Sequence, residues 1–131
     1  MQKSDMLTNL KENGFLVEEA MRYCAGVESI YREVLKSALE EGEEKLPLLE
    51  RCIKEKNFER YRIEVHGIKN VAQMIGATSL YEKANAQNEA TKAGDYESAL
   101  QNHNAFMEVY RQGLDLIKKI LGENYEQSIS N

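Results

Sequence analysis

Apolar residues recur at intervals of three and four positions along most of the chain, which is the spacing of amphipathic helices. Helices are therefore predicted over residues 15–24, 27–57, 58–75, 79–93 and 96–121, with a further short helix expected within the polar segment 1–13. Between 27 and 57 the apolar stripe comprises Val27, Tyr31, Val34, Ala38, Leu46, Leu49 and Ile53. In the last helix it comprises Ala99, Phe106, Tyr110, Leu114, Ile117 and Leu121.

Glycine, proline and capping residues indicate where these helices should end. Gly42 and Pro47 lie inside the segment 27–57, and because proline donates no backbone hydrogen bond, either one kinked helix or two helices can form there. Ser79 and Glu82 fit a capping box at the start of a helix. Further helix ends are expected at Asn13-Gly14, Gly26, Gly76, Gly94-Asp95 and Gly122.

The predicted fold class is all-α. Long Val, Ile and Thr alternations of the kind that predict strands are missing from the sequence. Four substantial helices joined by short loops favour an antiparallel up-down four-helix bundle with a short N-terminal helical extension. We expect the extension over residues 1–14, the bundle over 15–121 and a loose C-terminal tail over 122–131.

Composition narrows the classes of function. A length of 131 residues suggests one domain, and the net charge of −5 argues against a nucleic-acid partner. No apolar stretch approaches the roughly 20 residues that span a bilayer, and the first residues lack the apolar core of a signal peptide, so a cytoplasmic protein is expected. Cys24 and Cys52 are isolated and have no metal-ligand spacing, which favours buried, reduced thiols.

The two histidines differ in their helical surroundings. On a helical wheel of residues 58–75, His66 shares a polar stripe with Arg62, Lys69, Asn70 and Gln73. The opposite, apolar side comprises Tyr61, Val65, Ile68, Val71, Ala72 and Ile75. Glu64 falls on that side and is expected at its boundary. His103 lies on the apolar stripe of the last helix, which predicts a structural histidine at the edge of the core.

The segment VHGIKNVAQMIGA, residues 65–77, resembles the signature of histidine phosphotransfer (HPt) domains. That family has a histidine, a lysine three residues later and a glycine ten residues later, which here are His66, Lys69 and Gly76. The resemblance extends over about residues 15–121. The chain departs from the family at Asn70, where a small residue is common, and at Gln87-Asn88, where many members have an apolar residue and Glu.

The resemblance implies that His66 carries a phosphoryl group and exchanges it with the aspartate of response-regulator receiver domains in a multistep phosphorelay. A neutral imidazole nitrogen is available near pH 7, since the unperturbed pKa of imidazole is about 6.5. Lys69 and Gln73 would stabilise the phosphoryl group, and the amide of Asn70 can donate a further hydrogen bond. We expect partner docking at Arg62, Gly67, Asn70 and Gly76.

The expected partners are receiver domains and a hybrid histidine kinase, and the chain itself is expected to be a monomer. It has no Gly-rich phosphate-binding motif, so we expect a phosphoryl carrier rather than an enzyme with its own ATP site. No metal site is expected within the chain, because Mg²⁺ would come with the partner's receiver domain. The sequence leaves open the identity of the donor and the acceptor.

Two other functions compete with this one. The first is a docking or scaffold module that binds receiver or kinase domains without taking phosphate. The second is a metal-carboxylate bundle enzyme, which needs paired Glu-x-x-His motifs. Ile63 and Leu100 stand three residues before His66 and His103, so neither histidine has the required glutamate.

Overall fold

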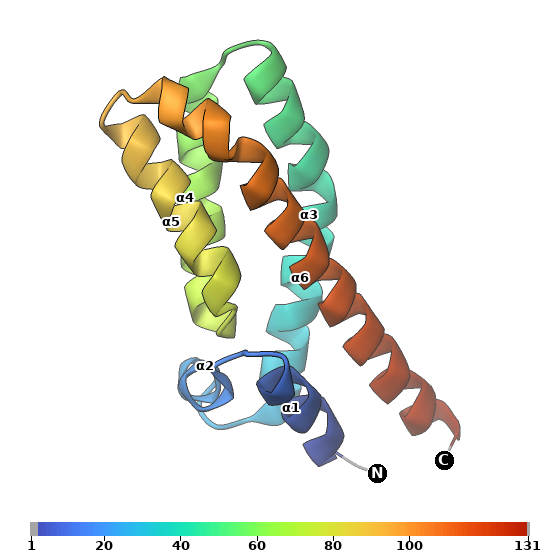
Figure 1. Cartoon of the computed structure of the whole chain (residues 1–131). Coiled ribbons are helices and arrows are strands. Elements are labelled where there is room, and N and C mark those ends of the chain that lie inside the picture. Colours follow the sequence, from blue (N-terminus) through green and yellow to red (C-terminus); the bar gives the residue numbers. More distant parts are fainter. Residues whose placement is uncertain (1–2, 131) are drawn as a thin grey trace.

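The computed structural model describes the backbone of residues 3–130 and the side chains of residues 6–122. The described residues form six helices and no strand (Figure 1), which confirms the all-α prediction. The helices are α1 (Lys3–Glu12), α2 (Val17–Tyr23), α3 (Glu28–Lys54), α4 (Phe58–Ile75), α5 (Thr78–Lys92) and α6 (Tyr96–Ser130). Within this part of the chain, no helix combines the length and apolar character needed to cross a membrane.

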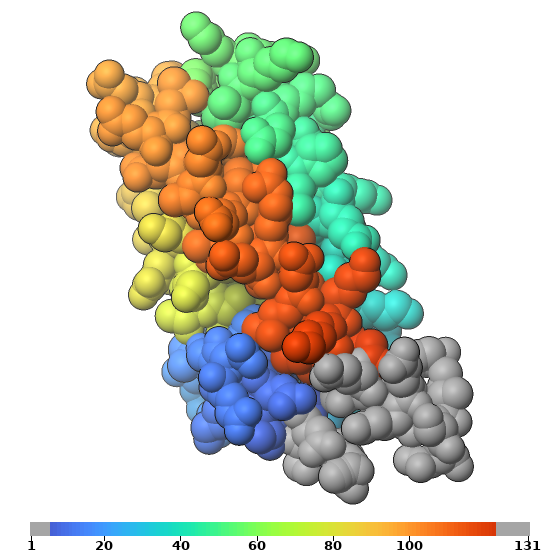
Figure 2. Space-filling view, turned by 45° about the vertical axis from the view of Figure 1, so that its right-hand side comes forward, coloured from blue at the N-terminus to red at the C-terminus, as the bar shows by residue number. Residues whose placement is uncertain are grey.

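The four long helices pack in a bundle-like arrangement in which each contacts two others. The contacting pairs are α3 with α4, α4 with α5, α5 with α6, and α6 with α3. Helices α1 and α2 lie together at one end of the molecule, where α1 packs on α6 and α2 packs on α4 (Figure 1). The space-filling view shows α6 lying between α5 and α3 on one face (Figure 2).

Residues 28–54 form one helix, which decides between the two alternatives that the sequence left open. Pro47 lies inside α3 on its exposed side, where solvent can satisfy the carbonyl group that loses its helical donor. Gly42 is buried, and an added Cβ would lie 2.4 Å from Cδ1 of Leu114. The glycine in this helix therefore allows α6 to approach α3 closely.

The buried face of α3 is wider than its predicted stripe. Tyr31, Ala38 and Leu49 are buried as expected, whereas Val27 is exposed. The stripe also missed Leu35 and Cys52, which are buried. Because α3 packs against both α4 and α6, it has two contact faces, and a single line of apolar positions underestimates them.

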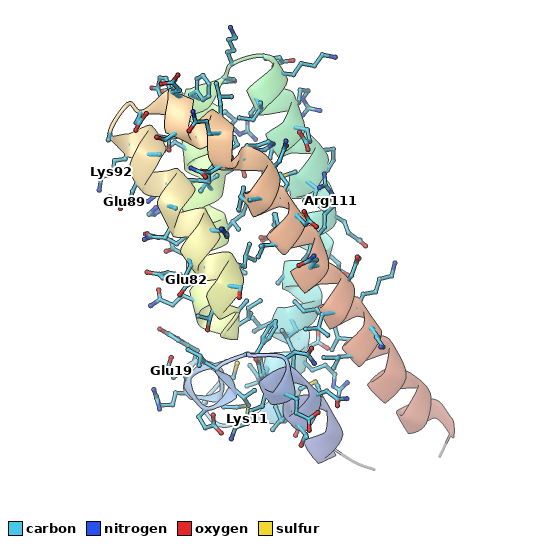
Figure 3. The ribbon with its side chains drawn as sticks, viewed as in Figure 1. Lys11, Glu19, Glu82, Glu89, Lys92 and Arg111 are labelled. Atoms are coloured by element: carbon cyan, nitrogen blue, oxygen red, sulfur yellow. The ribbon has the colours of Figure 1, made fainter. Side chains whose placement is uncertain are left out.

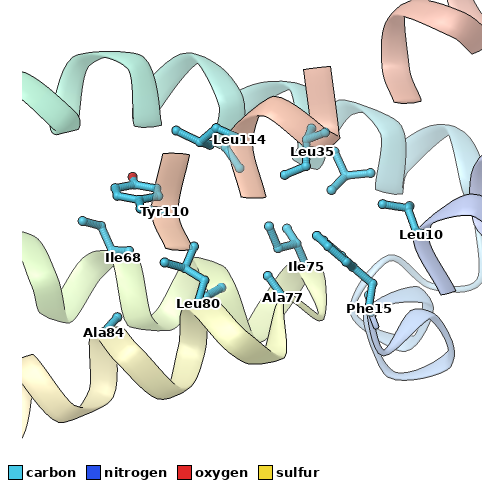
Figure 4. Packing of buried hydrophobic residues seen from close by; sticks show 14 of the residues in the cluster. Leu10, Phe15, Leu35, Ile68, Ile75, Ala77, Leu80, Ala84, Tyr110 and Leu114 are labelled. Atoms are coloured by element: carbon cyan, nitrogen blue, oxygen red, sulfur yellow. The ribbon is translucent and has the colours of Figure 1, made fainter. Parts of the chain in front are cut away.

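Residues from every helix contribute to one hydrophobic core. Figure 4 shows Leu10, Phe15, Leu35, Ile75 and Leu114 among the core side chains between the helices. Met6 and Leu10 of α1 have no exposed surface. The short first helix is thus part of the core.

Several predicted helix ends are confirmed and two are wrong. The turn at Gly94 has φ +77°, and Asp95 Oδ1 then accepts a hydrogen bond from the Ser98 N–H at 3.2 Å. The capping box at Ser79 is wrong, because α5 begins at Thr78 and no side chain caps it. The predicted end at Gly122 is also wrong, since α6 continues to Ser130, while Asn131 lies outside the described residues. A glycine within a helix is unfavourable by about 1 kcal/mol but does not force the helix to end.

The C-terminal end of α4 is fixed by Gly76. This residue adopts φ +79°, and the Ala77 N–H then donates to the Ala72 carbonyl oxygen at 2.9 Å. The Gly76 carbonyl accepts from the Leu16 N–H at 2.9 Å, and the Ile75 carbonyl accepts from the Tyr31 hydroxyl at 2.7 Å. The chain before α2 and the start of α3 therefore hold this end of α4.

We expect Gly76→Ala to destabilise the fold more than the matched change Gly94→Ala. Both glycines have a left-handed backbone, where an alanine costs about 1–2 kcal/mol. At Gly76 the new Cβ would also lie 2.7 Å from the Leu16 carbonyl oxygen, whereas at Gly94 no atom lies within 4 Å. Urea unfolding followed by circular dichroism measures both losses, and equal losses would contradict the close contact with Leu16.

Candidate functional site

His66 lies on the exposed side of α4, and the polar stripe predicted around it is confirmed. Arg62, Asn70 and Gln73 are exposed, and Lys69 is half-buried. The opposite side of α4 is buried along Tyr61, Val65, Ile68, Ala72 and Ile75, while Val71 is half-buried. Burial of that side against the core leaves the imidazole facing solvent.

Asn70 is the described residue that hydrogen-bonds to the His66 ring. Its Nδ2 lies 3.4 Å from Nε2 of His66, one helical turn away. Arg62, Lys69 and Gln73 share the face with His66, but their side chains form no hydrogen bond or ion pair with other described side chains. The structure therefore brings these predicted site residues together and leaves their donor groups available for a ligand.

The two glycines predicted for partner docking lie in different environments. Gly67, next to His66, is half-buried, and an added Cβ would find no atom within 4 Å. Gly76 is buried beneath Leu16 at the end of α4, about 15 Å along the helix axis from His66. Open space beside the histidine is therefore a property of Gly67, while Gly76 shapes the helix end.

An apolar strip, consisting of Ile63, Val71 and Met74, adjoins the polar stripe of α4, and Val71 and Met74 lie on the side that faces α3. Ile63 is 55% exposed, and it lies one turn before His66 on the helix. Val71 and Met74 border a shallow groove of about 520 Å³, which is lined on the α3 side by Ile30 and Val34, among others. Apolar surface is thus accessible within one or two turns of His66.

His103 is buried, as its position on an apolar stripe predicted, and it belongs to a polar network. Gln87 Nε2 donates to the Tyr61 hydroxyl at 2.8 Å, and that oxygen lies 2.9 Å from His103 Nδ1. Since Tyr61 accepts from Gln87, its own proton is free to be donated to Nδ1. Burial raises the pKa of Tyr61 to about 12, so the hydroxyl keeps this proton at neutral pH. The hydroxyl of Tyr61 is therefore the donor and Nδ1 of His103 the acceptor in this hydrogen bond.

The other ring nitrogen of His103 lies at the surface of the network. Its Nε2 is 3.2 Å from Oε1 of Glu50, and Oε2 of Glu50 accepts from Arg111 at 3.2 Å. Arg111 is labelled in Figure 3, on α6. The network thus joins residues from all four long helices, with both His103 and Arg111 from α6, and the sequence patterns did not predict it. The signal that the sequence offered is Gln87, because the family that the chain resembles commonly has an apolar residue at this position.

We expect the two histidines to respond differently to the same substitution. His103→Gln removes a buried hydrogen-bonding ring and leaves the Tyr61 hydroxyl poorly paired, so the free energy of unfolding should fall by about 1–3 kcal/mol. His66→Gln changes an exposed side chain and should stay within about 0.5 kcal/mol of the wild type. Urea unfolding compares them directly. A loss at His66 that matched the loss at His103 would contradict the surface position of His66.

Glu64 is buried between α3 and α4 rather than at a boundary. Lys45 of α3 pairs with its Oε1, and Arg60 Nε donates to Oε2 at 2.6 Å. Burial alone raises the pKa of this carboxyl, but the two hydrogen bonds outweigh burial and hold the pKa below its ordinary value. This charged contact links the helix of His66 to α3.

The lowered pKa of Glu64 predicts a loss of stability in acid. A carboxyl whose pKa is lower in the folded state stabilises the fold above its ordinary pKa of about 4.3, and this contribution is lost as the pH falls through the folded value. We expect the unfolding free energy of Glu64→Gln to depend less on pH between pH 6 and pH 3 than that of the wild type. Glu59→Gln, at an exposed position of α4, is the matched control. The same pH dependence in both variants would contradict the proposed ion pairs.

The comparisons with known proteins found no match for this chain. No family model, no curated protein and no solved structure matches it. Among the described residues, no three His, Cys, Asp or Glu side chains group as metal ligands would. The functional interpretation therefore depends on the geometry around His66.

Proposed function

We propose that this chain is a histidine phosphotransfer module that accepts and donates a phosphoryl group on His66. In this proposal α3–α6 form the antiparallel up-down four-helix bundle of that family, and the protein acts as a cytoplasmic monomer in a multistep phosphorelay. The observation that carries the proposal is the exposed imidazole of His66, with Lys69, Asn70 and Gln73 on the same face of α4. One nucleophile and three donors on one face suit phosphoryl transfer, which depends mainly on positioning and charge stabilisation.

The transfer step needs few groups from this chain. A lone pair on the imidazole forms a P–N bond while the P–O bond of an aspartyl phosphate breaks and its electron pair returns to the carboxylate. The ring then carries a positive charge and can release its remaining N–H proton to solvent. Lys69 lies one turn from His66, where its ammonium group can neutralise charge on the phosphoryl oxygens.

The partner is a receiver domain of a response regulator or of a hybrid kinase. It would approach over the apolar strip of Ile63, Val71 and Met74, with open space at Gly67 and an exposed cation at Arg62. The polar stripe around His66 contains no carboxylate, so its residues do not fit a Mg²⁺ site. The metal that assists the reaction belongs to the partner in this proposal, and the chain acts as a carrier without an ATP site.

Phosphate uptake is the decisive test. The full chain should become labelled when it is mixed with receiver domains that have been phosphorylated with acetyl phosphate. His66→Gln should remove the label completely, because it removes the nucleophile. The label should be lost in acid and survive in alkali, as expected for a phosphoramidate. Phosphate-affinity gel electrophoresis measures each result.

The control is Asn104→Gln, a substitution of similar size at an exposed position of α6. It should be labelled like the wild type. Equal labelling of the wild type and His66→Gln, or labelling of neither, contradicts the proposal. Binding of unphosphorylated receiver domains without any uptake would favour the alternative of a docking or scaffold module.

A further inference from the structure

The single hydrogen bond to the His66 ring distinguishes its two nitrogens. A neutral imidazole carries a proton on one nitrogen and a lone pair on the other, and only the nitrogen with the lone pair can attack phosphorus. The Asn70 amide nitrogen, which is a donor, lies 3.4 Å from Nε2. No described residue hydrogen-bonds to Nδ1, so no second contact opposes the effect of Asn70.

A donor beside Nε2 stabilises the lone pair on that atom and therefore places the ring proton on Nδ1. This preference is opposite to that of a free histidine side chain, whose neutral form carries its proton mainly on Nε2. Without the amide, the nitrogen at the exposed tip of the ring would be protonated for much of the time. It would then have to lose that proton before it could accept phosphate.

We propose that Asn70 is a positioning residue that keeps the ring proton of His66 on Nδ1 and presents the lone pair of Nε2 to the phosphoryl donor. The consequence for transfer rests on the proposed function, whereas the tautomer preference does not. The same amide can donate to a phosphoryl oxygen once phosphorus occupies the position of the lone pair. This role belongs to a position where the chain departs from the pattern that it resembles, since a side chain as small as glycine has no donor to offer.

The effect should be modest, because the bond is long and exposed. A weak hydrogen bond of this kind changes the ratio of the two tautomers by about two- to fivefold. The direction in which the tautomer ratio changes is a sharper test than the size of the change. Asn70→Ala removes the donor, so the fraction with the proton on Nδ1 should fall. Asn70→Asp replaces the donor with an acceptor that attracts a proton to Nε2, so this fraction should fall further.

Two-bond proton–nitrogen correlation spectra of the ¹⁵N-labelled full chain report the tautomer directly, at about pH 9, where imidazoles are neutral. The signals of His66 are identified by their absence in His66→Gln. Gln73→Ala, a change on the same face with no contact to the ring, is the matched control and should leave the ratio unchanged. The expected order of the Nδ1–H fraction is wild type and Gln73→Ala first, then Asn70→Ala, then Asn70→Asp.

An equal ratio in the wild type and Asn70→Ala overturns the proposal. A higher Nδ1–H fraction in Asn70→Ala also overturns it, because the amide oxygen would then be the atom that faces the ring. In the transfer assay, Asn70→Ala should take up phosphate about two- to fivefold more slowly than the wild type, whereas Asn104→Gln, the control at an exposed position of α6, should match the wild type. Equal rates for Asn70→Ala and Asn104→Gln, with the tautomer shifted, would also overturn it. If the wild type takes up no phosphate, the proposed function fails, and the spectra still decide the tautomer.

Discussion

The site depends on how α4 is held at its C-terminal end. The last carbonyl groups of a helix have no partner within the helix, and here two of them are bonded from outside it. Leu16 donates its backbone N–H to Gly76, and Tyr31 donates its hydroxyl to Ile75. These bonds fix the rotation of α4 about its own axis as well as its position. That rotation decides which residues meet the core and which meet solvent, so the exposure of His66 follows from it.

The second constraint on α4 comes from the paired polar side chains on its inner side. Glu64 faces α3 with two cations around it, and Tyr61 faces the core with its hydroxyl fully used. Leaving either group without a hydrogen-bond partner in the interior would destabilise the fold. A rotated helix would bury His66 and expose Tyr61, and both changes would break existing hydrogen bonds. The polar contacts on the inner side therefore define the outer side, on which we propose that phosphate is carried.

Local patterns in the sequence were sufficient to predict the bounds of α4. Its predicted range, 58–75, coincides with the observed helix, because the left-handed Gly76 that ends it is a signal that acts within one turn. The same patterns also predicted that His66 lies on a polar stripe and that His103 is a structural residue. Local patterns failed at Ser79, because α5 starts one residue earlier, at Thr78, directly after the turn at Gly76 and Ala77. They could not choose between one and two helices over 27–57, since the packing of Leu114 on Gly42 joins residues far apart in the chain.

The polar network that joins Glu50, Tyr61, Gln87 and His103 also has an evolutionary consequence. It takes one residue from each long helix and lies on the inner side of α4, so none of its members is on the stripe that surrounds His66. Substitutions on the outer face can therefore accumulate without disturbing the alignment of the helices. A duplicated copy of this gene could acquire a new partner through changes at positions such as Arg62, Ile63 and Gly67, while the scaffold that presents the histidine is inherited intact.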